Sequence, residues 1–375
     1  MIVLVLGNLS DSVLRFRGDL LRALIVEGHE VHVATPHLTD DGSTSDLLRD
    51  MGVTCHDVFM SRTGTNPVAD ARTLLSIVML MRRIRPDVSL GYTIKPVVYG
   101  LLAGWVTRVP KRFALVNGLG YALADKVVGW RRRVLQGVVF SLYRLAMRHA
   151  SAVFFQNPDD AALFLGRGLL PERVRSIVVN GSGVPTDAYA VAAFPQTPPS
   201  FVLIARLLVE KGIRDYVAAA RLIRASHPEV VFHLVGGVDA NPGAISAAEV
   251  QGWHDEGVVR WHGQLHDVRP VLASAHVFVL PSFYREGTPR TVLEAMSMGR
   301  PIVTTDMPGC RETVVEGENG FLVPPRAADA LATAMLRFVE DPAMVVWMGS
   351  RSRQLAEDRY DVRKVNAVMI SAMGL

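Results

Sequence analysis

The sequence predicts an α/β protein of two doubly wound domains, each a parallel sheet with helices on both faces. The chain has 375 residues, which is long enough for two domains that each bury a core. Short runs of leucine and β-branched residues alternate with longer helical patterns in both halves. Between the halves lies the stretch AFPQTPPS, which is rich in proline and predicts a linker.

The first half opens as a βαβ unit, with a strand at Met1–Leu6, a helix at Phe16–Gly28 and a strand at Val31–Ala34. The same alternation continues to the linker. It predicts further strands at Val88–Gly91, Phe113–Val116, Val153–Gln156 and Ile177–Val179, and further helices at Ala69–Arg85 and Arg131–His149. Strands that alternate with helices indicate a parallel sheet buried on both faces.

The second half repeats the pattern directly after the linker. It predicts strands at Phe201–Ala205, Val230–Val235, Val258–Trp261, Val277–Leu280 and Pro301–Thr304, with a helix at Gly212–Ser226. We therefore expect an N-terminal domain at residues 1–190, a C-terminal domain at 191–359, and a segment at 360–375 that packs back on the N-terminal domain. Ligands of such sheets bind beyond the carboxyl ends of the strands, so two facing domains would bind substrate in a cleft.

Composition and charge exclude several classes of protein. With 49% hydrophobic and 20% charged residues, the chain is globular rather than disordered. Cys55 and Cys310 lack the spacing of a metal or redox site. No secretory signal begins the chain and no run of about 18 apolar residues occurs, so we expect a cytoplasmic protein that does not span a membrane.

Two glutamates eight residues apart, Glu286 and Glu294, flank a turn that leads into a predicted helix. Gly287 and Pro289 favour the turn, and the helix is expected at Thr291–Met298. The N-terminus of a helix presents free backbone N–H groups that bind diphosphate. The spacing alone is weak evidence, because most surface glutamates are simply solvated.

Two further strand ends carry residues suited to the same ligand. Arg206 and Lys211 follow the predicted strand Phe201–Ala205, and diphosphate is bound by such cations. Solvated surface charges are the alternative. In the loop HGQLHD, Gly263 and Leu265 would admit a base close to the backbone, whereas His262 is better explained as a structural histidine.

The motifs LIARLLVEKG, VVFHLVGG, NGSGVPTDAY and FVLPSFYREGTPRTVLEAMSMGRPIVTTD resemble the retaining nucleotide-sugar glycosyltransferases of GT-B fold that carry an E-x7-E signature. The resemblance spans essentially the whole chain. It implies that Arg206 and Lys211 contact the donor diphosphate, that Glu294 binds the ribose and that Glu286 contacts the donor sugar. Glu286, Arg206 and Lys211 are the expected catalytic residues. The expected donor-binding residues are Glu294, Gly287, Thr288, Pro289, Arg290, Thr291, Gly263 and Leu265.

The stretches RFRGDLLRAL, YTIKPVVYG, VNGLGYAL and VFFQNPDD resemble, less sharply, bacterial enzymes that lengthen undecaprenyl-diphosphate-linked oligosaccharides, including N-acetylgalactosaminyl transferases. This resemblance implies acceptor-side residues at Arg17, Lys95, Asn117, Gly118 and Tyr121. Each is equally well explained as a surface charge or a packing residue. Two departures from the wider family are the absence of a Gly-Gly pair in residues 7–12 and of a histidine near Gly118, so no general base is assigned.

These resemblances imply a mechanism without cofactor or metal. Without a clear protein nucleophile, front-face attack is expected, with Arg206, Lys211 and helix N–H groups stabilising the leaving diphosphate. No Asp-x-Asp motif occurs at a suitable loop, so we expect a metal-independent enzyme. The nucleotide sugar is a substrate, and a uridine diphosphate N-acetylhexosamine is favoured.

A basic helical stretch, WRRRVLQGVVFSLYRLAMRH, predicts a membrane contact. Residues 105–150 hold nine basic residues and one acid. The apolar residues Val134, Val138, Leu142, Leu145 and Ala146 recur at helical spacing, flanked by Arg131, Arg132, Arg133, Arg144 and Arg148. Such a helix can lie on anionic lipid at the inner face of the cell membrane. An ordinary core helix with solvated arginines is the alternative, and no motif suggests nucleic acid.

The expected function is a retaining hexosyltransferase. It would move an N-acetylhexosamine from a nucleotide diphosphate sugar to a polyprenyl-diphosphate-linked glycan at the cytoplasmic face of the membrane. Three alternatives stay open: a sugar-nucleotide 2-epimerase, a glycosyltransferase with a soluble acceptor, and a sugar-nucleotide-binding protein without catalysis. A dinucleotide-dependent oxidoreductase is excluded, because neither GNLSDS nor LVGGVDAN is a G-x-G-x-x-G turn.

Overall fold

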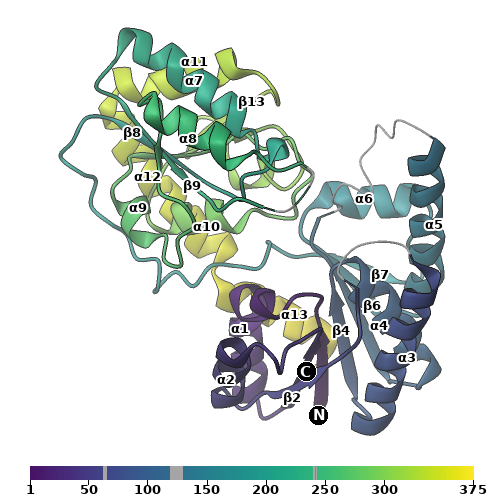
Figure 1. Ribbon diagram of the computed structural model, residues 1–375. Coiled ribbons are helices and arrows are strands. Elements are labelled where there is room, and N and C mark those ends of the chain that lie inside the picture. The colour runs from purple at the N-terminus through teal and green to yellow at the C-terminus, as the bar shows by residue number, and fades with distance from the viewer. Residues whose placement is uncertain (62–65, 119–129, 240, 242) are drawn as a thin grey trace. The chain divides into compact units, whose positions relative to one another are not determined.

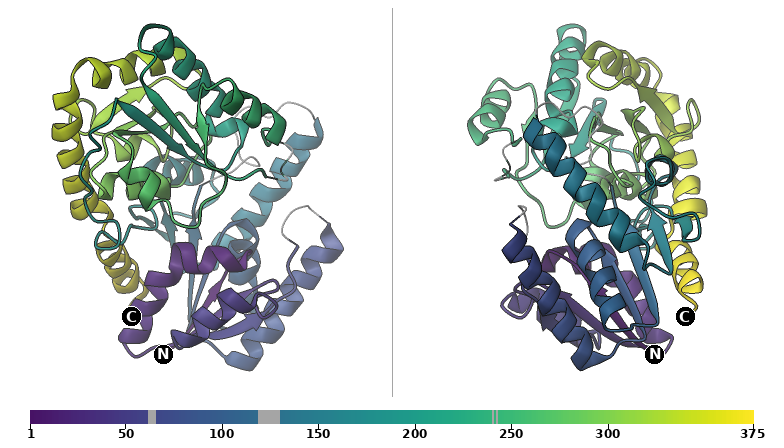
Figure 2. Two further views of the ribbon diagram at one scale, coloured as in Figure 1. Left: turned by 60° about the vertical axis from the view of Figure 1, so that its left-hand side comes forward. Right: turned by 90° about the vertical axis from the view of Figure 1, so that its right-hand side faces the viewer.

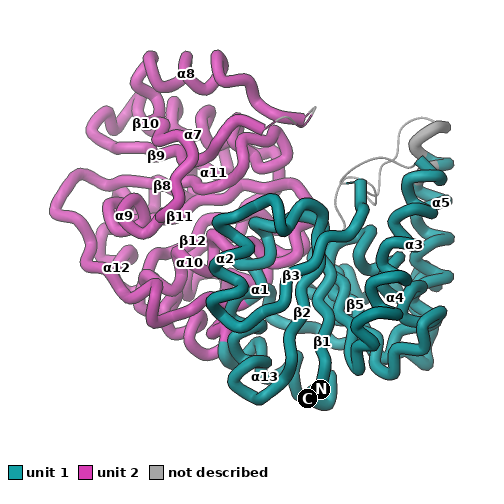
Figure 3. The backbone as a smooth tube through the Cα atoms, turned by 60° about the horizontal axis from the view of Figure 1, so that its bottom comes forward, with its two compact units in different colours: residues 1–182, 363–375 teal, residues 183–362 magenta. Residues whose placement is uncertain are grey.

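The structure, a computed structural model, describes residues 1–61, 66–118, 130–239, 241 and 243–375. The chain divides into two compact units, unit 1 with residues 1–182 and 363–375, and unit 2 with residues 183–362 (Figure 3). The chain therefore first passes from unit 1 to unit 2 at 182/183, rather than at the expected 190/191. The reason is a bridge inside unit 2, where the amide of Val184 donates to the carbonyl of Tyr360 at 2.8 Å.

Unit 1 holds a seven-stranded parallel sheet in the order β3-β2-β1-β4-β5-β6-β7 (Figure 1). The strands are β1 (Ile2–Leu6), β2 (Glu30–Thr35), β3 (Thr54–Asp57), β4 (Val88–Tyr92), β5 (Lys111–Val116), β6 (Ala152–Phe155) and β7 (Arg175–Val178). The helices are α1 (Ser10–Val26), α2 (Gly42–Asp50), α3 (Pro67–Ile84), α4 (Ile94–Val106), α5 (Trp130–Met147), α6 (Pro158–Gly166) and α13 (Val362–Met373).

Alternation along β1 shows why helices cover both faces of this sheet (Figure 2). Leu4 and Leu6 are fully buried among residues of α3, α4 and α5. Val3 and Val5 are fully buried on the opposite face, among residues of α1 and α13. Successive side chains of a strand point to opposite faces, so a continuous apolar run requires a core on each side.

Unit 2 holds a six-stranded parallel sheet in the order β10-β9-β8-β11-β12-β13. The strands are β8 (Ser200–Ile204), β9 (Val231–Val235), β10 (Arg260–Trp261), β11 (Val277–Leu280), β12 (Ile302–Thr305) and β13 (Gly320–Val323). The α-helices are α7 (Ile213–Ser226), α8 (Ala247–Asp255), α9 (Arg269–Ala273), α10 (Arg290–Ser297), α11 (Ala328–Glu340) and α12 (Pro342–Leu355). The shorter helical turns are η2 (Val209–Lys211), η3 (Arg311–Thr313) and η4 (Ala356–Tyr360).

Arg300 holds the proline-rich segment to unit 2. Its guanidinium is fully buried and donates to the carbonyls of Ala192 and Ala193 at 3.0 and 3.2 Å. It also donates to the carbonyls of Leu272 and Ala273, at 3.0 and 3.2 Å. Burial lowers the pKa of Arg300 to about 10. The expected linker is therefore bound to its own domain by a buried cation.

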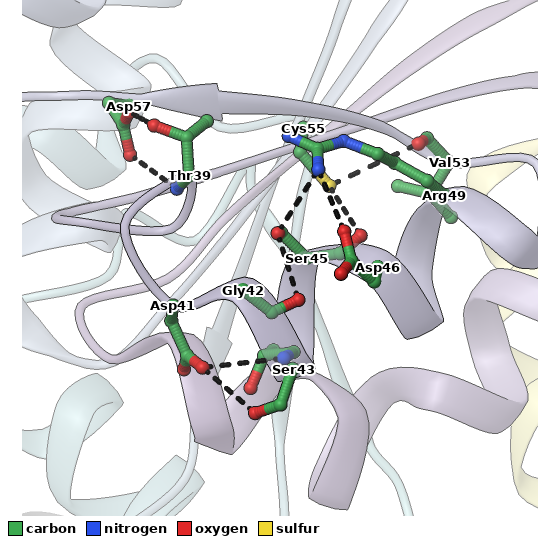
Figure 4. Close-up of polar contacts among 11 residues, drawn as sticks. Thr39, Asp41, Gly42, Ser43, Ser45, Asp46, Arg49, Val53, Cys55 and Asp57 are labelled. Carbon is green, nitrogen blue, oxygen red and sulfur yellow. Dashed lines mark hydrogen bonds and ion pairs between the residues drawn. The ribbon is translucent and has the colours of Figure 1, made fainter.

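Sequence analysis missed α2 and β3 at the edge of unit 1, where polar contacts replace an apolar pattern (Figure 4). The Asp41 carboxylate caps α2 by accepting from the Thr44 amide at 3.3 Å. Arg49 donates to the side chains of Ser45 and Asp46 at 3.3 and 3.0 Å. β3 is an edge strand and none of its four residues is buried, so its sequence carries little period-2 signal.

The loop before α2 is tied to β3 in the same view. The Asp57 carboxylate accepts from the backbone amide of Thr39 at 3.0 Å and also from the Thr39 hydroxyl (Figure 4). These contacts hold the end of β3, and β3 pairs in parallel with β2 along its whole length.

Candidate functional site

The candidate site of unit 2 forms where the loop after β8 meets the loop after β11. Gly212 ends η2 with φ of 72°. A Cβ atom at Gly212 would lie 1.9 Å from the carbonyl oxygen of Pro281, so only glycine allows this approach. The amide of Phe283 donates to the carbonyl of Glu210 at 2.9 Å. Two loops distant in sequence thus form one platform at the carboxyl edge of the sheet.

Lys211 and Glu286 form an ion pair on this platform, with side chains 14% and 11% exposed. Ser282 is fully buried, and its hydroxyl donates to Glu286 Oε1 at 2.9 Å. The Lys211 ammonium nitrogen also lies 5.7 Å from the centre of the Tyr284 ring. The structure thus brings together two of the three residues predicted to be catalytic, and a serine orients their carboxylate.

Gly309 supports the turn that follows Glu286. It has φ of 85°, and a Cβ atom there would lie 2.1 Å from the carbonyl oxygen of Gly287. The adjacent Cys310 is fully buried, and burial together with the charge of Glu286 raises the pKa of its thiol to about 12. Sequence analysis missed Gly309, although the Pro-Gly pair after β12 was a usable signal.

The second glutamate lies inside α10, the helix that begins after the turn. Glu294 is 3% exposed, and Arg290, one turn earlier, donates through Nε to Glu294 Oε1 at 3.1 Å. Pro289 precedes the helix, and Thr288 before it is buried. The backbone N–H groups of a first helical turn have no partner inside the helix, so α10 presents donors at this turn.

Arg206, the third predicted catalytic residue, lies at the end of β8 and is more open. Its side chain is 55% exposed, and its guanidinium pairs with Asp239 at 3.2 Å. Asp239 belongs to the loop after β9. The two predicted cations therefore have different partners, Lys211 a nearly buried carboxylate and Arg206 a carboxylate at an exposed loop.

The loop after β10 is open at Gly263. Gly263 has φ of 67°, and a Cβ atom there would meet nothing within 4 Å. Its carbonyl accepts from the amide of Gly236 at 2.8 Å, and the Trp261 indole donates to the carbonyl of Gly236 at 3.0 Å. Leu265 is half-buried and packs against the apolar cluster of α9 and α10. His262 pairs with His233 at 2.9 Å, as a structural histidine would.

In unit 1, the two cations predicted on the acceptor side are held inside the unit. Arg17 on α1 is only 1% exposed, and its guanidinium carbon lies 5.4 Å from the centre of the Tyr92 ring. Lys95, at the start of α4, donates to Ser61 at 2.6 Å and to Asp70 at 2.8 Å. Its charge is therefore already matched by a carboxylate.

The remaining acceptor-side predictions lie at the end of β5. Asn117 and Gly118 follow that strand and are half-buried, and Gly118 has φ of 95°. Tyr121 lies outside the described residues. Nearby, Thr93 precedes α4 with φ of 68°, which is an uncommon conformation for a β-branched residue.

Helix α5 forms where the basic stretch predicted it, but its apolar residues divide between two faces. Ala146 is fully buried, and Leu142 is half-buried against the core. Val134, Val138 and Leu145 are 58%, 47% and 47% exposed. The prediction that these five residues share one face is therefore wrong in part. An apolar stripe about 100° wide can straddle the boundary between the side of a helix that meets the core and the side that meets solvent.

The arginines of α5 also differ in their surroundings. Arg144 donates to the carbonyls of Gly168 and Arg167 at 3.0 and 3.1 Å, so it holds the end of α6 as well as being exposed. Arg133 and Arg148 are exposed, whereas the side chains of Arg131 and Arg132 lie outside the described residues. Among the described residues, no helix is long and apolar enough to cross a membrane. In that same part of the chain, no three His, Cys, Asp or Glu residues are grouped so that they could hold a metal ion.

Two family profiles match the chain, one for each half. The profile described as "Glycosyl transferase 4-like domain" matches residues 14–181. The profile described as "Glycosyl transferases group 1" matches residues 198–341, which include the whole platform of Lys211, Glu286 and Glu294.

Among curated proteins, the N,N'-diacetylbacillosaminyl-diphospho-undecaprenol alpha-1,3-N-acetylgalactosaminyltransferase of Campylobacter jejuni is 26% identical over 366 residues, covering 93% of this chain and 92% of that protein. The capsular polysaccharide biosynthesis glycosyltransferase CapM of Staphylococcus aureus is 22% identical and covers 78% of this chain and 77% of its own.

Among solved structures, Anabaena HepE in complex with UDP has a TM-score of 0.78 at 20% identity, covering 100% of both chains. Sucrose-phosphate synthase from Thermosynechococcus elongatus has a TM-score of 0.78 at 19% identity, covering 99% of this chain and 98% of its own. These likenesses show that the fold is GT-B, as predicted.

Proposed function

The chain belongs to the glycosyltransferases of GT-B fold, and we propose that it transfers an N-acetylhexosamine, with retention, from a uridine diphosphate sugar to a polyprenyl-diphosphate-linked glycan. The observation that carries this proposal is the Lys211–Glu286 pair beside the first turn of α10. The printed name of the Campylobacter jejuni relative, an N-acetylgalactosaminyltransferase acting on a diphospho-undecaprenol, supports the choice of donor sugar and acceptor.

The donor would bind across the loops of unit 2. Lys211 and the N–H groups at the start of α10 would hold the diphosphate, because both place positive charge where the phosphate oxygens would lie. Glu286 would accept hydrogen bonds from hydroxyls of the sugar, and Glu294 would accept them from the ribose. Gly263 leaves room for the base.

The chemical step would proceed on one face of the sugar. The bond between the anomeric carbon and the diphosphate oxygen breaks, and the acceptor oxygen attacks that carbon from the same side. The acceptor proton passes to an oxygen of the departing diphosphate. Lys211 and Arg206 stabilise the negative charge that grows there, and a stabiliser already in position needs little rearrangement during reaction.

The positive charge of these groups makes a metal ion unnecessary for the leaving group. We therefore expect transfer to continue when a chelator removes divalent cations. Loss of activity on chelation, restored by one added metal, would contradict this part of the proposal.

The acceptor would come from a membrane, with α5 facing the lipid. Its exposed side carries Val134, Val138 and Leu145 together with Arg133 and Arg148. Apolar side chains enter the lipid interface, and each basic residue near an anionic surface contributes about 1 kcal/mol. We expect the protein to act as a peripheral protein at the inner face of the cell membrane.

The proposal is tested with a panel of sugar nucleotides and a short glycan on a polyprenyl diphosphate. Mass spectrometry of the lipid product identifies the sugar that is added, and NMR of the new linkage reports the anomeric configuration. Epimerised free sugar formed without acceptor would favour the 2-epimerase alternative. Equal rates with a soluble acceptor glycan would show that the acceptor need not be lipid-linked. Binding of a sugar nucleotide without transfer or epimerisation would indicate a sugar-nucleotide-binding protein.

A further inference from the structure

Exposed apolar residues gather in unit 1 where α4 and α5 end. The two helices pack against each other (Figure 1), and both end at the edge of the sheet where its strands begin. Trp105 and Val106 close α4 and are 52% and 48% exposed. The Trp105 indole stacks on the imidazole of His149, which follows α5, with ring centres 4.3 Å apart. The indole is therefore held in place although half of the residue faces solvent.

An open cavity of about 450 Å³ lies beside this indole. It is lined by the end of α4, the turn after it and the start of β5, with the residues Trp105, Val106, Arg108, Val109, Pro110 and Arg112. Cavities of about 300 to 1,000 Å³ are typical of small-ligand sites. The lining combines apolar side chains with two guanidinium groups, which suits a ligand that has an anionic end and an apolar remainder.

Arg108 occupies a backbone position that favours glycine. The amide of Val109 donates to the carbonyl of Gly104 at 2.8 Å, and the amide of Arg108 donates to the carbonyl of Trp105 at 3.2 Å. This pair of bonds ends α4 as a Schellman motif, in which the residue of left-handed conformation is usually glycine. Arg108 has φ of 60°. Glycine would form the same turn without strain, so the turn itself gives no reason for an exposed arginine.

Arg112 brings a second positive charge to the cavity. Its stem passes close to Gly104, where a Cβ atom would lie 3.0 Å from Arg112 Cδ. The guanidinium donates to the carbonyl of His149 at 2.6 Å and also to the carbonyl of Val109. Burial lowers the pKa of Arg112. The carbonyls orient this cation without neutralising it, so a bound anion would supply the missing charge.

Two further arginines add to the positive charge around the indole. Arg173 donates to the carbonyl of Arg148 at 3.1 Å, and Arg148 directly precedes His149. Burial lowers the pKa of His149, and the charges of Arg112, Arg173 and Arg148 lower it further. Within the described part of the chain, no carboxylate forms an ion pair with these three arginines or with Arg108. The surface is thus complementary to an anionic partner.

We propose that this cavity binds the phosphate of an anionic phospholipid headgroup, with Arg108 and Arg112 on the phosphate oxygens and the Trp105 indole among the lipids at the interface. Guanidinium groups bind phosphate through two parallel hydrogen bonds, and indole rings concentrate at the membrane–water interface. A lipid is favoured over free phosphate because Trp105 and Val106 expose apolar surface beside the cations.

This inference rests on the proposed function in one respect, the contact of unit 1 with a membrane. The cavity lies at the edge where the strands begin, whereas substrates of such sheets bind at the carboxyl edge. The headgroup would therefore hold the enzyme on the membrane without entering the reaction.

Arg108→Gly tests the phosphate contact, because it removes the cation and keeps a backbone that glycine adopts easily. Sedimentation with phosphatidylcholine vesicles that contain phosphatidylglycerol should show binding about fivefold weaker than that of the wild type, which corresponds to about 1 kcal/mol for one cation at an anionic surface. The thermal midpoint should not fall. A clear fall would assign Arg108 to stabilisation of α4 instead.

The matched control is Arg85→Gly. Arg85 ends α3 in the same unit, is exposed and has φ of 52°, so the control loses the same charge from the same backbone conformation. Its binding to the vesicles should stay within about twofold of the wild type, because it does not line the cavity. Equal weakening by both changes would reduce the effect to net charge and overturn the headgroup site.

Tryptophan fluorescence tests the indole contact. The emission of the wild type should shift to shorter wavelength when vesicles containing phosphatidylglycerol are added, and lipids brominated in their acyl chains should quench it. The chain has five tryptophans, so Trp105→Phe identifies the source of the signal. Most of the shift and the quenching should disappear in this variant. A full shift in Trp105→Phe would overturn the placement of the indole in the lipid.

The outcomes separate the headgroup site from the proposed function. If the wild type binds the vesicles and Arg108→Gly binds them equally well, the site is wrong while a lipid contact through α5 stands. If the wild type binds inorganic phosphate in calorimetry but no vesicle, both the headgroup and the membrane contact are overturned. Sugar transfer to a soluble acceptor glycan should be the same in wild type and Arg108→Gly, and its absence from both would overturn the proposed reaction without touching the vesicle result.

Discussion

The two units place their predicted polar residues in opposite ways. In unit 2, the predicted residues bond to one another, Lys211 to Glu286 and Arg290 to Glu294. In unit 1, the predicted cation Lys95 bonds to Asp70 and Ser61, which sequence analysis did not consider. The difference shows that the predicted residues of unit 2, which follow β8 and β11, contact one another, whereas the predicted cation of unit 1 is matched by residues outside the prediction.

The largest expected effect comes from replacing one lysine in each unit, Lys211 in unit 2 and Lys95 in unit 1. Lys211→Met and Lys95→Met each leave a carboxylate without its cation, at 11% and 16% side-chain exposure. We expect each to lower the free energy of unfolding by about 3 kcal/mol, because removing one partner of a largely buried pair is strongly destabilising. Only Lys211→Met should also lower kcat/KM, by about a thousandfold, through the lost charge at the diphosphate.

Denaturant titration and steady-state kinetics on both variants check this prediction. The matched stability loss is the control, because it separates a folding defect from a defect in the reaction. An equal loss of kcat/KM in both variants would contradict the contrast between the units and give Lys95 a direct part in the reaction.

The next largest effect concerns one exposed helix in each unit, α5 in unit 1 and α12 in unit 2. Val134→Asp on α5 of unit 1 should weaken binding to vesicles that contain anionic lipid about tenfold, because it removes apolar contact and adds repulsion. Val346→Asp on α12 of unit 2 is the control, since both valines are similarly exposed, at 58% and 60%. Vesicle sedimentation measures both. Equal weakening by the two changes would mean that α5 is not the lipid-facing element.

The smallest effect concerns a feature that the units share. In unit 1, His32 on β2 pairs with His56 on β3 at 2.8 Å, and in unit 2, His233 on β9 pairs with His262 after β10 at 2.9 Å. Desolvation, the partner histidine and a nearby arginine lower the pKa of both His56 and His233 to about 4. An ordinary histidine titrates near 6.5, so the folded state is penalised as pH falls.

The direction of this pH dependence follows from the linkage between proton binding and folding. Because the folded pKa of His56 and of His233 lies below the unfolded one, protonation of these two histidines disfavours the folded state, and stability is lost as pH falls from about 6.5 toward 4. We expect the urea midpoint to decline over that range, and His56→Asn and His233→Asn to flatten the decline. An unchanged pH profile in both variants would show that neither pair titrates with unfolding.

The fold was largely predictable, and particular residues explain where prediction stopped. Lys211 and Glu286 lie in loops after strand ends, and Glu294 lies in the helix that follows, so a local pattern marks these residues of the candidate site. Gly309 was missed because it acts through its backbone from a separate loop.

The outer face of α5 and the polar edge of unit 1 were harder to predict from the sequence, for different reasons. A helical period does not tell which side of an apolar stripe meets the core, so Ala146 and Val134 were assigned to one face although one is buried and the other exposed. The residues of β3, Thr54–Asp57, carry no apolar alternation, because their strand ends the sheet. Such positions are determined by neighbours rather than by their own sequence.

The return of α13 to unit 1 has a consequence for synthesis of the chain on the ribosome. Met369, Ile370 and Met373 are buried in the same apolar cluster as Val3 and Val5 of β1. The residues made first therefore share a core with residues made some 360 positions later, whereas unit 2 is continuous in sequence. Unit 1 therefore exposes part of its core until residues 363–375 have left the ribosome, whereas the core of unit 2 needs no residue beyond 362.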